Sequence, residues 1–183
     1  YLKMNKKKIL ALSGIEIHTR PLFSSGLGVF SEIYRKKNFA EEFSQDSFSV
    51  SDKKNTLRGM HFQNPPFAQA KLVTVLSGSI IDFVIDIRKN SPTFKEYASI
   101  ELSKENGKMI YIPEGFAHGF QTLEDNTCVF YKLSNYYSPE HEITLKWNDP
   151  TIGIEWGAKN TTHMSDKDKA GELFATIEKD LNF

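Results

Sequence analysis

The chain has 183 residues, which suits one domain with a sizeable core and leaves too little for two. Its 23 basic residues balance its 23 acidic residues, so the composition excludes a protein that coats nucleic acid through bulk positive charge. The single cysteine, Cys128, excludes a disulfide framework and fits a reducing compartment, so we expect a cytoplasmic protein.

The N-terminal part of the chain carries weak structural signals. The run Met4–Ser13 is basic and then apolar, like the start of a secretion signal, but its apolar part is too short for one. No segment approaches the length of a membrane span, so we expect no membrane partner. Further on, Ser31–Phe43 could hold one short helix.

Strand signals dominate the middle of the chain. Two apolar runs, Lys71–Leu76 and Ile80–Ile87, are separated by a turn that contains Gly78, which predicts a hairpin. Many short strands at regular spacing are typical of a sandwich or barrel, so we predict a mainly β fold, a double-stranded β-helix (jelly roll) with short flanking helices. Further strands are expected at Glu96–Leu102, Lys108–Ile112, Phe116–Leu123 and Thr127–Ser134.

The C-terminal segment carries the strongest helical signal. Ser165 and Asp168 form a Ser-x-x-Asp capping box, and apolar residues follow at helical spacing, so we expect a helix over Ser165–Leu181. We expect this helix to pack on the barrel. The chain is thus predicted to be one domain, residues 1–183, with a β core at about 9–158 and a helical extension at about 159–183.

Two of the five histidines stand out from the others. His61 and His118 each follow a glycine-containing turn and enter a strand flanked by aromatic residues, although a buried histidine without a function remains the alternative for either one. By contrast, His18, His141 and His163 have polar neighbours, which predicts solvated positions. His61 and His118 are therefore the candidates for chemistry.

A jelly roll with histidines suggests a metal-binding cupin. Such a site usually needs two or three histidines and a carboxylate around one ion, with the first pair spaced His-x-His. Here His61 is followed by Phe62 and Gln63, and an amide is a poor replacement for the second imidazole. We therefore predict no metal and no other cofactor, and keep a metal-dependent cupin enzyme as the alternative.

The residues suit metal-free acid–base chemistry better. Removing a proton from a carbon beside a ketone needs a base that works near neutral pH, which His61 supplies. The enolate oxygen needs a cation or donor, which Lys71 could supply. Tyr131 could return a proton on the other face of the ring. A base on one face and an acid on the other describe an epimerase.

At these residues the chain resembles the dTDP-4-dehydrorhamnose 3,5-epimerase family, metal-free cupins of deoxysugar biosynthesis. The similarity extends from about Asn55 to Trp156, and the segment SDKD near the C-terminus matches as well. Several of the matching segments are long and specific. They are NTLRGMHFQ, AQAKLVTVLSGSIIDFVIDIRKNSPTF, IPEGFAHGF, FYKLSNYYSPEHE and WNDPTIGIEW.

The resemblance implies proton abstraction and return at C3, C5 or both of a nucleoside-diphosphate 4-keto-6-deoxyhexose, in the synthesis of a surface polysaccharide. It implies that His61 is the base with Asp168 as its partner. It also implies that Lys71 polarises the C4 oxygen, that Tyr131 donates the proton, and that Asp82 orients Lys71. The implied substrate-binding residues are Arg58, His118 and Lys167 at the diphosphate, Tyr137 on the nucleotide side, and Glu32 and Gln45.

Each catalytic assignment has a structural alternative. Asp168 could serve only the helix cap, and Lys71 could be an edge lysine whose charged end reaches water. Tyr131 could pack in the core with its hydroxyl satisfied, and Arg58 could pair with a structural carboxylate. A protein that only binds a sugar nucleotide is therefore another alternative, although binding alone would need neither His61 nor Tyr131.

The chain departs from the family pattern upstream of the catalytic residues. The family's D-x-R-G-x-F-x-E segment is present with Ser25 and Leu27 in place of its aspartate and arginine, and Ser47 replaces an asparagine near the nucleoside. These changes affect nucleotide-facing positions, so the carrier could be CDP or GDP in place of dTDP. The resemblance also implies a homodimer that exchanges N-terminal strands.

Overall fold

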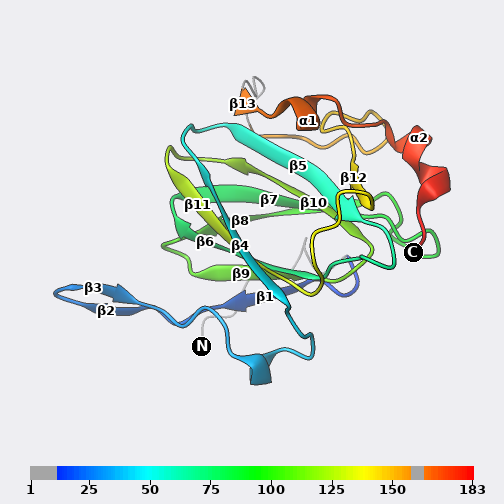
Figure 1. The fold of residues 1–183 in the computed structure, drawn as a ribbon. Helices are drawn as coiled ribbons and strands as arrows, with labels where there is room; N and C mark the ends of the chain where they lie inside the picture. Colours follow the sequence, from blue (N-terminus) through cyan, green and yellow to red (C-terminus); the bar gives the residue numbers. More distant parts are fainter. Residues whose placement is uncertain (1–11, 158–162) are drawn as a thin grey trace.

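The computed structural model describes residues 12–157 and 163–183. Its strands form two large sheets that face each other, and a small hairpin extends away from them (Figure 1). The predicted mainly β jelly roll with a short C-terminal helix is confirmed. The expected starts of the core at about 9 and of the extension at about 159 lie outside the described residues.

The order of the strands shows that the chain crosses repeatedly between the two sheets. The first sheet has the order β1 (Glu16–Thr19), β9 (Lys108–Ile112), β6 (Lys71–Ser77), β11 (Thr127–Leu133) and β4 (Gln45–Ser51). The second has the order β12 (Glu142–Thr144), β5 (Thr56–Gln63), β10 (Phe116–Thr122), β7 (Ser79–Asp86) and β8 (Tyr97–Ser103), and β13 (His163–Met164) pairs in parallel with β5.

The predicted hairpin between the two apolar runs is wrong. Strand β6 pairs with β9 and β11, whereas β7 pairs with β8 and β10, so the chain passes from one sheet to the other at Gly78. Gly78 has a φ of 73°, and a Cβ there would lie 2.5 Å from the Thr127 hydroxyl oxygen. The turn lies where the sequence places it, but turn residues alone do not determine which strands pair.

Strand β7 places one charged side chain, Asp82, inside the barrel. Its Ile80 and Val84 pack in the apolar cluster between the two sheets, whereas Phe83 packs on the other side in a cluster with Phe174. Side chains alternate along a strand, so Asp82 points to the same side as Ile80 and Val84. The Asp82 carboxylate is consequently fully buried inside the barrel.

The C-terminal segment is not the single helix predicted over Ser165–Leu181. It contains α1 (Asp166–Lys169), α2 (Phe174–Ile177) and the 3₁₀ turn η3 (Glu178–Asp180). Between α1 and α2 the backbone of Glu172 leaves helical geometry, donating to Thr144 O at 2.9 Å and accepting from Lys146 N at 2.7 Å. These bonds to the last residue of β12 and to Lys146 just beyond it outweigh the helical pattern. No helix in the described ranges is long and apolar enough to span a membrane.

The N-terminal segment leaves apolar side chains in solvent. In place of the helix expected over Ser31–Phe43 it has only the 3₁₀ turn η2 (Lys36–Asn38). The hairpin of β2 (Phe23–Ser25) and β3 (Gly28–Phe30) projects from the barrel (Figure 1). Its Phe30 is 70% exposed, and Phe48 on the edge strand β4 is 71% exposed. Such a surface is typical of an interaction site.

Candidate active site

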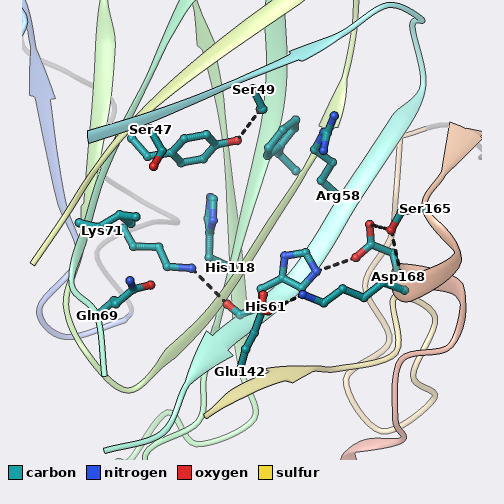
Figure 2. Close-up of a pocket in the computed structure, with 14 residues that line it drawn as sticks. Ser47, Ser49, Arg58, His61, Gln69, Lys71, His118, Glu142, Ser165 and Asp168 are labelled. Atoms are coloured by element: carbon teal, nitrogen blue, oxygen red, sulfur yellow. Dashed lines mark hydrogen bonds and ion pairs between the residues drawn. The ribbon is translucent and has the colours of Figure 1, made fainter. Parts of the chain in front are cut away.

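A cavity of about 340 Å³ opens inside the barrel, and both sheets and the α1 segment contribute to its wall. Figure 2 shows the side chains of Lys71, His118 and His61 pointing into the same space. Seven of the ten predicted site residues line this cavity together with seven other residues. The lining residues are Ser47, Ser49, Arg58, His61, Gln69, Lys71, His118, Phe120, Tyr131, Leu133, Glu142, Ser165, Lys167 and Asp168.

An irregularity in β5 brings two predicted residues to one face. In a regular strand Arg58 and His61, three positions apart, would point to opposite faces. The pairing of β5 with β10 shifts register between them, at Gly59, which has a φ of 122°. A Cβ at Gly59 would lie 2.6 Å from the Gly119 Cα, so only glycine permits this close approach. Arg58 and His61 therefore both line the cavity.

His61 and Asp168 form an imidazole–carboxylate pair. His61 Nε2 lies 2.6 Å from Asp168 Oδ1, and the Asp168 side chain is only 4% exposed. Ser165 Oγ donates to Asp168 Oδ2 at 2.8 Å and accepts from its backbone N–H, so the carboxylate partners His61 and belongs to the helix cap as well. Burial opposes ionisation, but the hydrogen bond and charge of His61, together with hydrogen bonds from Ser165 and the Gly59 backbone, lower the pKa of Asp168.

Lys71 is a buried amine beside the same histidine. Its Nζ donates to the backbone oxygen of His61 at 3.3 Å. Burial lowers the pKa of Lys71 to about 8, and the charges of Glu142 and Asp82 oppose this shift. A weakly hydrated cation in such a site is well suited to stabilise a developing oxyanion.

Tyr131 and His118 occupy the inner wall of the cavity. The Tyr131 hydroxyl lies 2.9 Å from Ser49 Oγ, and burial raises the pKa of Tyr131. His118 is 5% exposed, and its Nε2 lies 2.7 Å from Asp82 Oδ2. Asp82 thus bonds to His118 and not to Lys71, the residue we expected it to orient. The His118 ring lies beside that of Tyr131, with 6.4 Å between the ring centroids.

A second cluster, formed by Lys167, Glu142, Tyr137 and Gln45, borders the mouth of the cavity. Lys167 forms an ion pair with Glu142, and the Tyr137 hydroxyl donates to Glu142 Oε2 at 2.6 Å. Burial would raise the pKa of Glu142, but the hydrogen bonds from Lys167 and Tyr137 lower it. Gln45 Oε1 accepts from the Tyr137 backbone N–H at 3.0 Å. Tyr137 and Gln45 thus join the site through neighbours that line it.

The structure does not bring Glu32 to the cavity. Glu32 follows the projecting hairpin, and its carboxylate pairs with Arg35 at 2.5 Å on an exposed stretch of chain. It therefore cannot contact a substrate held by the cavity of the same chain, which corrects the expectation for this residue within one subunit.

The sequence analysis missed Glu142 and Ser49 because it did not identify their strands. Strand β12 has three residues and no strand signature. Strand β4, QDSFSVS, alternates strictly, but its serines face the cavity and its Phe48 and Val50 face outward. Alternation in Gln45–Ser51 could have predicted the strand, although the usual rule would have assigned the faces the wrong way round.

Within residues 12–157 and 163–183, no group of three or more His, Cys, Asp or Glu side chains is placed to hold an ion. The histidine–carboxylate contacts among these residues are separate pairs: His61 with Asp168, His118 with Asp82, and His18 with Glu16.

Comparison with known proteins identifies the family. The family model described as dTDP-4-dehydrorhamnose 3,5-epimerase matches residues 9–176. The dTDP-4-dehydrorhamnose 3,5-epimerase of Salmonella typhimurium is 44% identical over 169 residues, which cover 89% of this chain and 92% of that protein.

Two solved structures share the fold over most of their length. The Bacillus anthracis dTDP-4-dehydrorhamnose 3,5-epimerase, with TDP and PPi bound, has a TM-score of 0.84 and 40% identity, covering 88% of this chain and 94% of its own. The Legionella pneumophila dTDP-6-deoxy-D-glucose-3,5-epimerase, in complex with dTDP-4-keto-L-rhamnose, has a TM-score of 0.87 and 35% identity, covering 92% of each chain. This chain therefore belongs to the dTDP-4-dehydrorhamnose 3,5-epimerase family.

Proposed function

We propose that this protein inverts C3 and C5 of a dTDP-linked 4-keto-6-deoxyhexose in deoxysugar biosynthesis, without a cofactor. The observation that carries the proposal is one cavity lined by the His61–Asp168 pair, a half-buried lysine and a half-buried tyrosine. The names of the relatives support the substrate class and the two positions of inversion.

In the proposed reaction His61 removes the proton from the carbon beside the ketone. Asp168 holds the imidazole in one tautomer and stabilises the imidazolium that forms. Lys71 faces the C4 oxygen and stabilises its negative charge in the enolate. Tyr131 then donates its hydroxyl proton to the opposite face of the same carbon. His118, held by Asp82, orients the sugar beside Tyr131.

The nucleotide would extend from the sugar toward the mouth of the cavity. Arg58 and Lys167 are the cations on this side that could bind the diphosphate, with Lys167 exchanging Glu142 for phosphate oxygens. Tyr137, which is half exposed, offers a ring for the base. The relatives favour dTDP as the carrier, and CDP and GDP stay as alternatives because of the replaced residues.

The test is hydrogen exchange in deuterated water. Incubation with a dTDP-4-keto-6-deoxyhexose should replace the hydrogens at C3 and C5 by deuterium and invert both centres, as followed by NMR. A complete lack of exchange with the dTDP, CDP and GDP sugars contradicts the proposal. Exchange that EDTA abolishes and a transition metal restores would support the metal-dependent alternative. Binding without exchange would support the binding-module alternative.

The carrier can be identified from thermal stability. A ligand that binds only the folded protein stabilises it by about 2.7 kcal/mol at 100 times its Kd. We expect dTDP to raise the melting temperature more than CDP, GDP or UDP at equal concentration. A larger shift with CDP or GDP would assign the carrier to that nucleotide and refute dTDP.

The buried amine predicts an alkaline limit to activity. Because Lys71 must be protonated to stabilise the enolate, and burial lowers its pKa to about 8, kcat/KM should fall as the pH rises through 8. Lys71→Arg, whose guanidinium stays charged, should have a lower rate, but its kcat/KM should no longer fall as the pH rises through 8. If kcat/KM of Lys71→Arg still falls through pH 8, the fall is caused by the titration of another group.

We further propose that the chain forms a homodimer through its projecting hairpin. The exposed apolar side chains of Phe23, Phe30 and Phe48 support this proposal, since a lone subunit would leave them in water. An exchanged hairpin would also bring Glu32 to the partner. Light scattering should give about twice the chain mass of 20.9 kDa, and Phe30→Asp should shift the protein toward monomer.

A further inference from the structure

The cavity wall contains a second carboxylate besides the partner of His61. Among the described residues that line the cavity, the carboxylates are Asp168 and Glu142. Asp168 bonds to His61, whereas Glu142 forms an ion pair with Lys167. The Glu142 side chain is only 12% exposed, so its charge is weakly screened by water and acts more strongly on neighbouring charges than a surface carboxylate would.

Strand pairing places Glu142 on the same face of the second sheet as His61. In the register of β12 with β5, Thr144 lies opposite His61, and Glu142 lies two positions before Thr144. Opposite residues of an antiparallel pair share a face, and so do residues two positions apart, so Glu142 is a diagonal neighbour of His61. Figure 2 shows the Glu142 side chain extending toward His61 in the cavity.

Glu142 acts on both of the cations proposed for the chemistry. Burial raises its pKa, but hydrogen bonds from Lys167 and Tyr137 and the positive charge of His61 lower it. Its own charge opposes the burial that lowers the pKa of Lys71 to about 8. A carboxylate that attracts both groups favours the imidazolium of His61 and the ammonium of Lys71, which are the forms present once the enolate has formed.

Without substrate, this negative charge is partly neutralised at the mouth of the cavity. Lys167 and the Tyr137 hydroxyl both donate to Glu142 Oε2, and the Lys167 side chain is 50% exposed. An ion pair with one exposed partner breaks at small cost, so Lys167 can move to the phosphate oxygens of a bound nucleotide. Glu142 then loses its cation, and its attraction for His61 and Lys71 increases.

We infer that Glu142 is a positioning residue that couples binding of the diphosphate to removal of the sugar proton, an inference that rests on the proposed function. Before binding, Glu142 holds Lys167 at the mouth of the cavity. After binding, it becomes a second counter-ion of His61 in addition to Asp168. The proton moves from the carbon to His61, the electron pair of the C–H bond forms the enolate, and the resulting imidazolium is stabilised by two carboxylates.

The first test is Glu142→Gln, which keeps the shape and an acceptor for Tyr137 but removes the charge. We expect kcat to fall about tenfold, because the imidazolium loses one of its counter-ions. Calorimetry should show dTDP binding about threefold more tightly, because Lys167 no longer has to leave a carboxylate. A purely structural role would weaken both. Glu178→Gln is the matched control, since Glu178 pairs with Lys95 at 2.9 Å outside the cavity and should change neither quantity.

The second test divides the substrate into two parts. Hydrogen exchange is measured by NMR on a 4-keto-6-deoxyhexose that lacks the nucleotide, with and without inorganic pyrophosphate. In the wild-type protein pyrophosphate should speed exchange about tenfold, because it draws Lys167 away from Glu142 and so uses remote binding energy at the reacting carbon. In Glu142→Gln the same addition should speed exchange less than about twofold, because no charge is left to be released.

The outcomes separate this coupling from the epimerase activity itself. A wild-type kcat in Glu142→Gln, or weaker binding of dTDP, would overturn the inference while leaving the epimerase proposal intact. Equal activation by pyrophosphate in the two proteins would do the same. If Glu142→Gln did not fold, a lack of activation in the wild-type protein would still refute the coupling. A wild-type protein that exchanges no hydrogen with its nucleotide sugar would overturn the proposed function, and the coupling with it.

Discussion

Replacing His61 with alanine is expected to lower the rate of hydrogen exchange and of epimerisation by about 10²–10⁴-fold, the range for loss of a general base. No other described side chain that lines the cavity combines an imidazole with a direct carboxylate partner and partial exposure, since His118 is buried against Asp82. The dTDP-induced rise in melting temperature should persist, because His61 is proposed to act on the sugar and not on the nucleotide.

Two variants show whether the effect is specific to the catalytic pair. Asp168→Asn should also lower kcat strongly, since an amide cannot stabilise the imidazolium that forms. His163→Ala, which removes an exposed histidine of β13, should leave the rate unchanged. An undiminished rate in His61→Ala would remove this residue from the mechanism and leave the base unidentified.

Replacing Tyr131 with phenylalanine is expected to separate exchange from inversion. His61 can still remove a proton and return one to the same face, so deuterium should continue to enter the sugar with retained configuration. Inversion should fall by about 10²–10⁴-fold, because the acid on the other face is absent. NMR of the sugar in deuterated water measures both quantities in one experiment.

A matched control for this variant is Tyr111→Phe. The Tyr111 hydroxyl donates to Glu41 at 3.2 Å outside the cavity, so its loss should change neither quantity. If Tyr131→Phe inverted the sugar at the wild-type rate, another donor would be required. If it abolished exchange as well as inversion, Tyr131 would instead be needed for enolate formation.

The sequence alone predicted most of the strands in the middle of the chain, their approximate bounds, and several residues of the site. The strand over Lys108–Ile112 was predicted with its observed bounds, and the other strands predicted in the middle of the chain differ by one or two residues at their ends. These are local properties, because apolar runs and turn residues act over a few positions. The long family motifs similarly pointed to His61, Lys71 and Tyr131, which share one cavity.

The tertiary structure decided which strands pair and which distant side chains come into contact. Asp168 reaches His61 across 107 positions of sequence, and Arg58 joins them only because β5 shifts register at Gly59. Gly78 connects two sheets in place of a hairpin, and Glu172 ends a helical pattern by bonding to the end of β12 and the residue pair beyond it. Each of these depends on backbone hydrogen bonds between distant segments. Local pattern cannot specify such bonds, since the partner of a strand edge is chosen by the packing of the whole barrel.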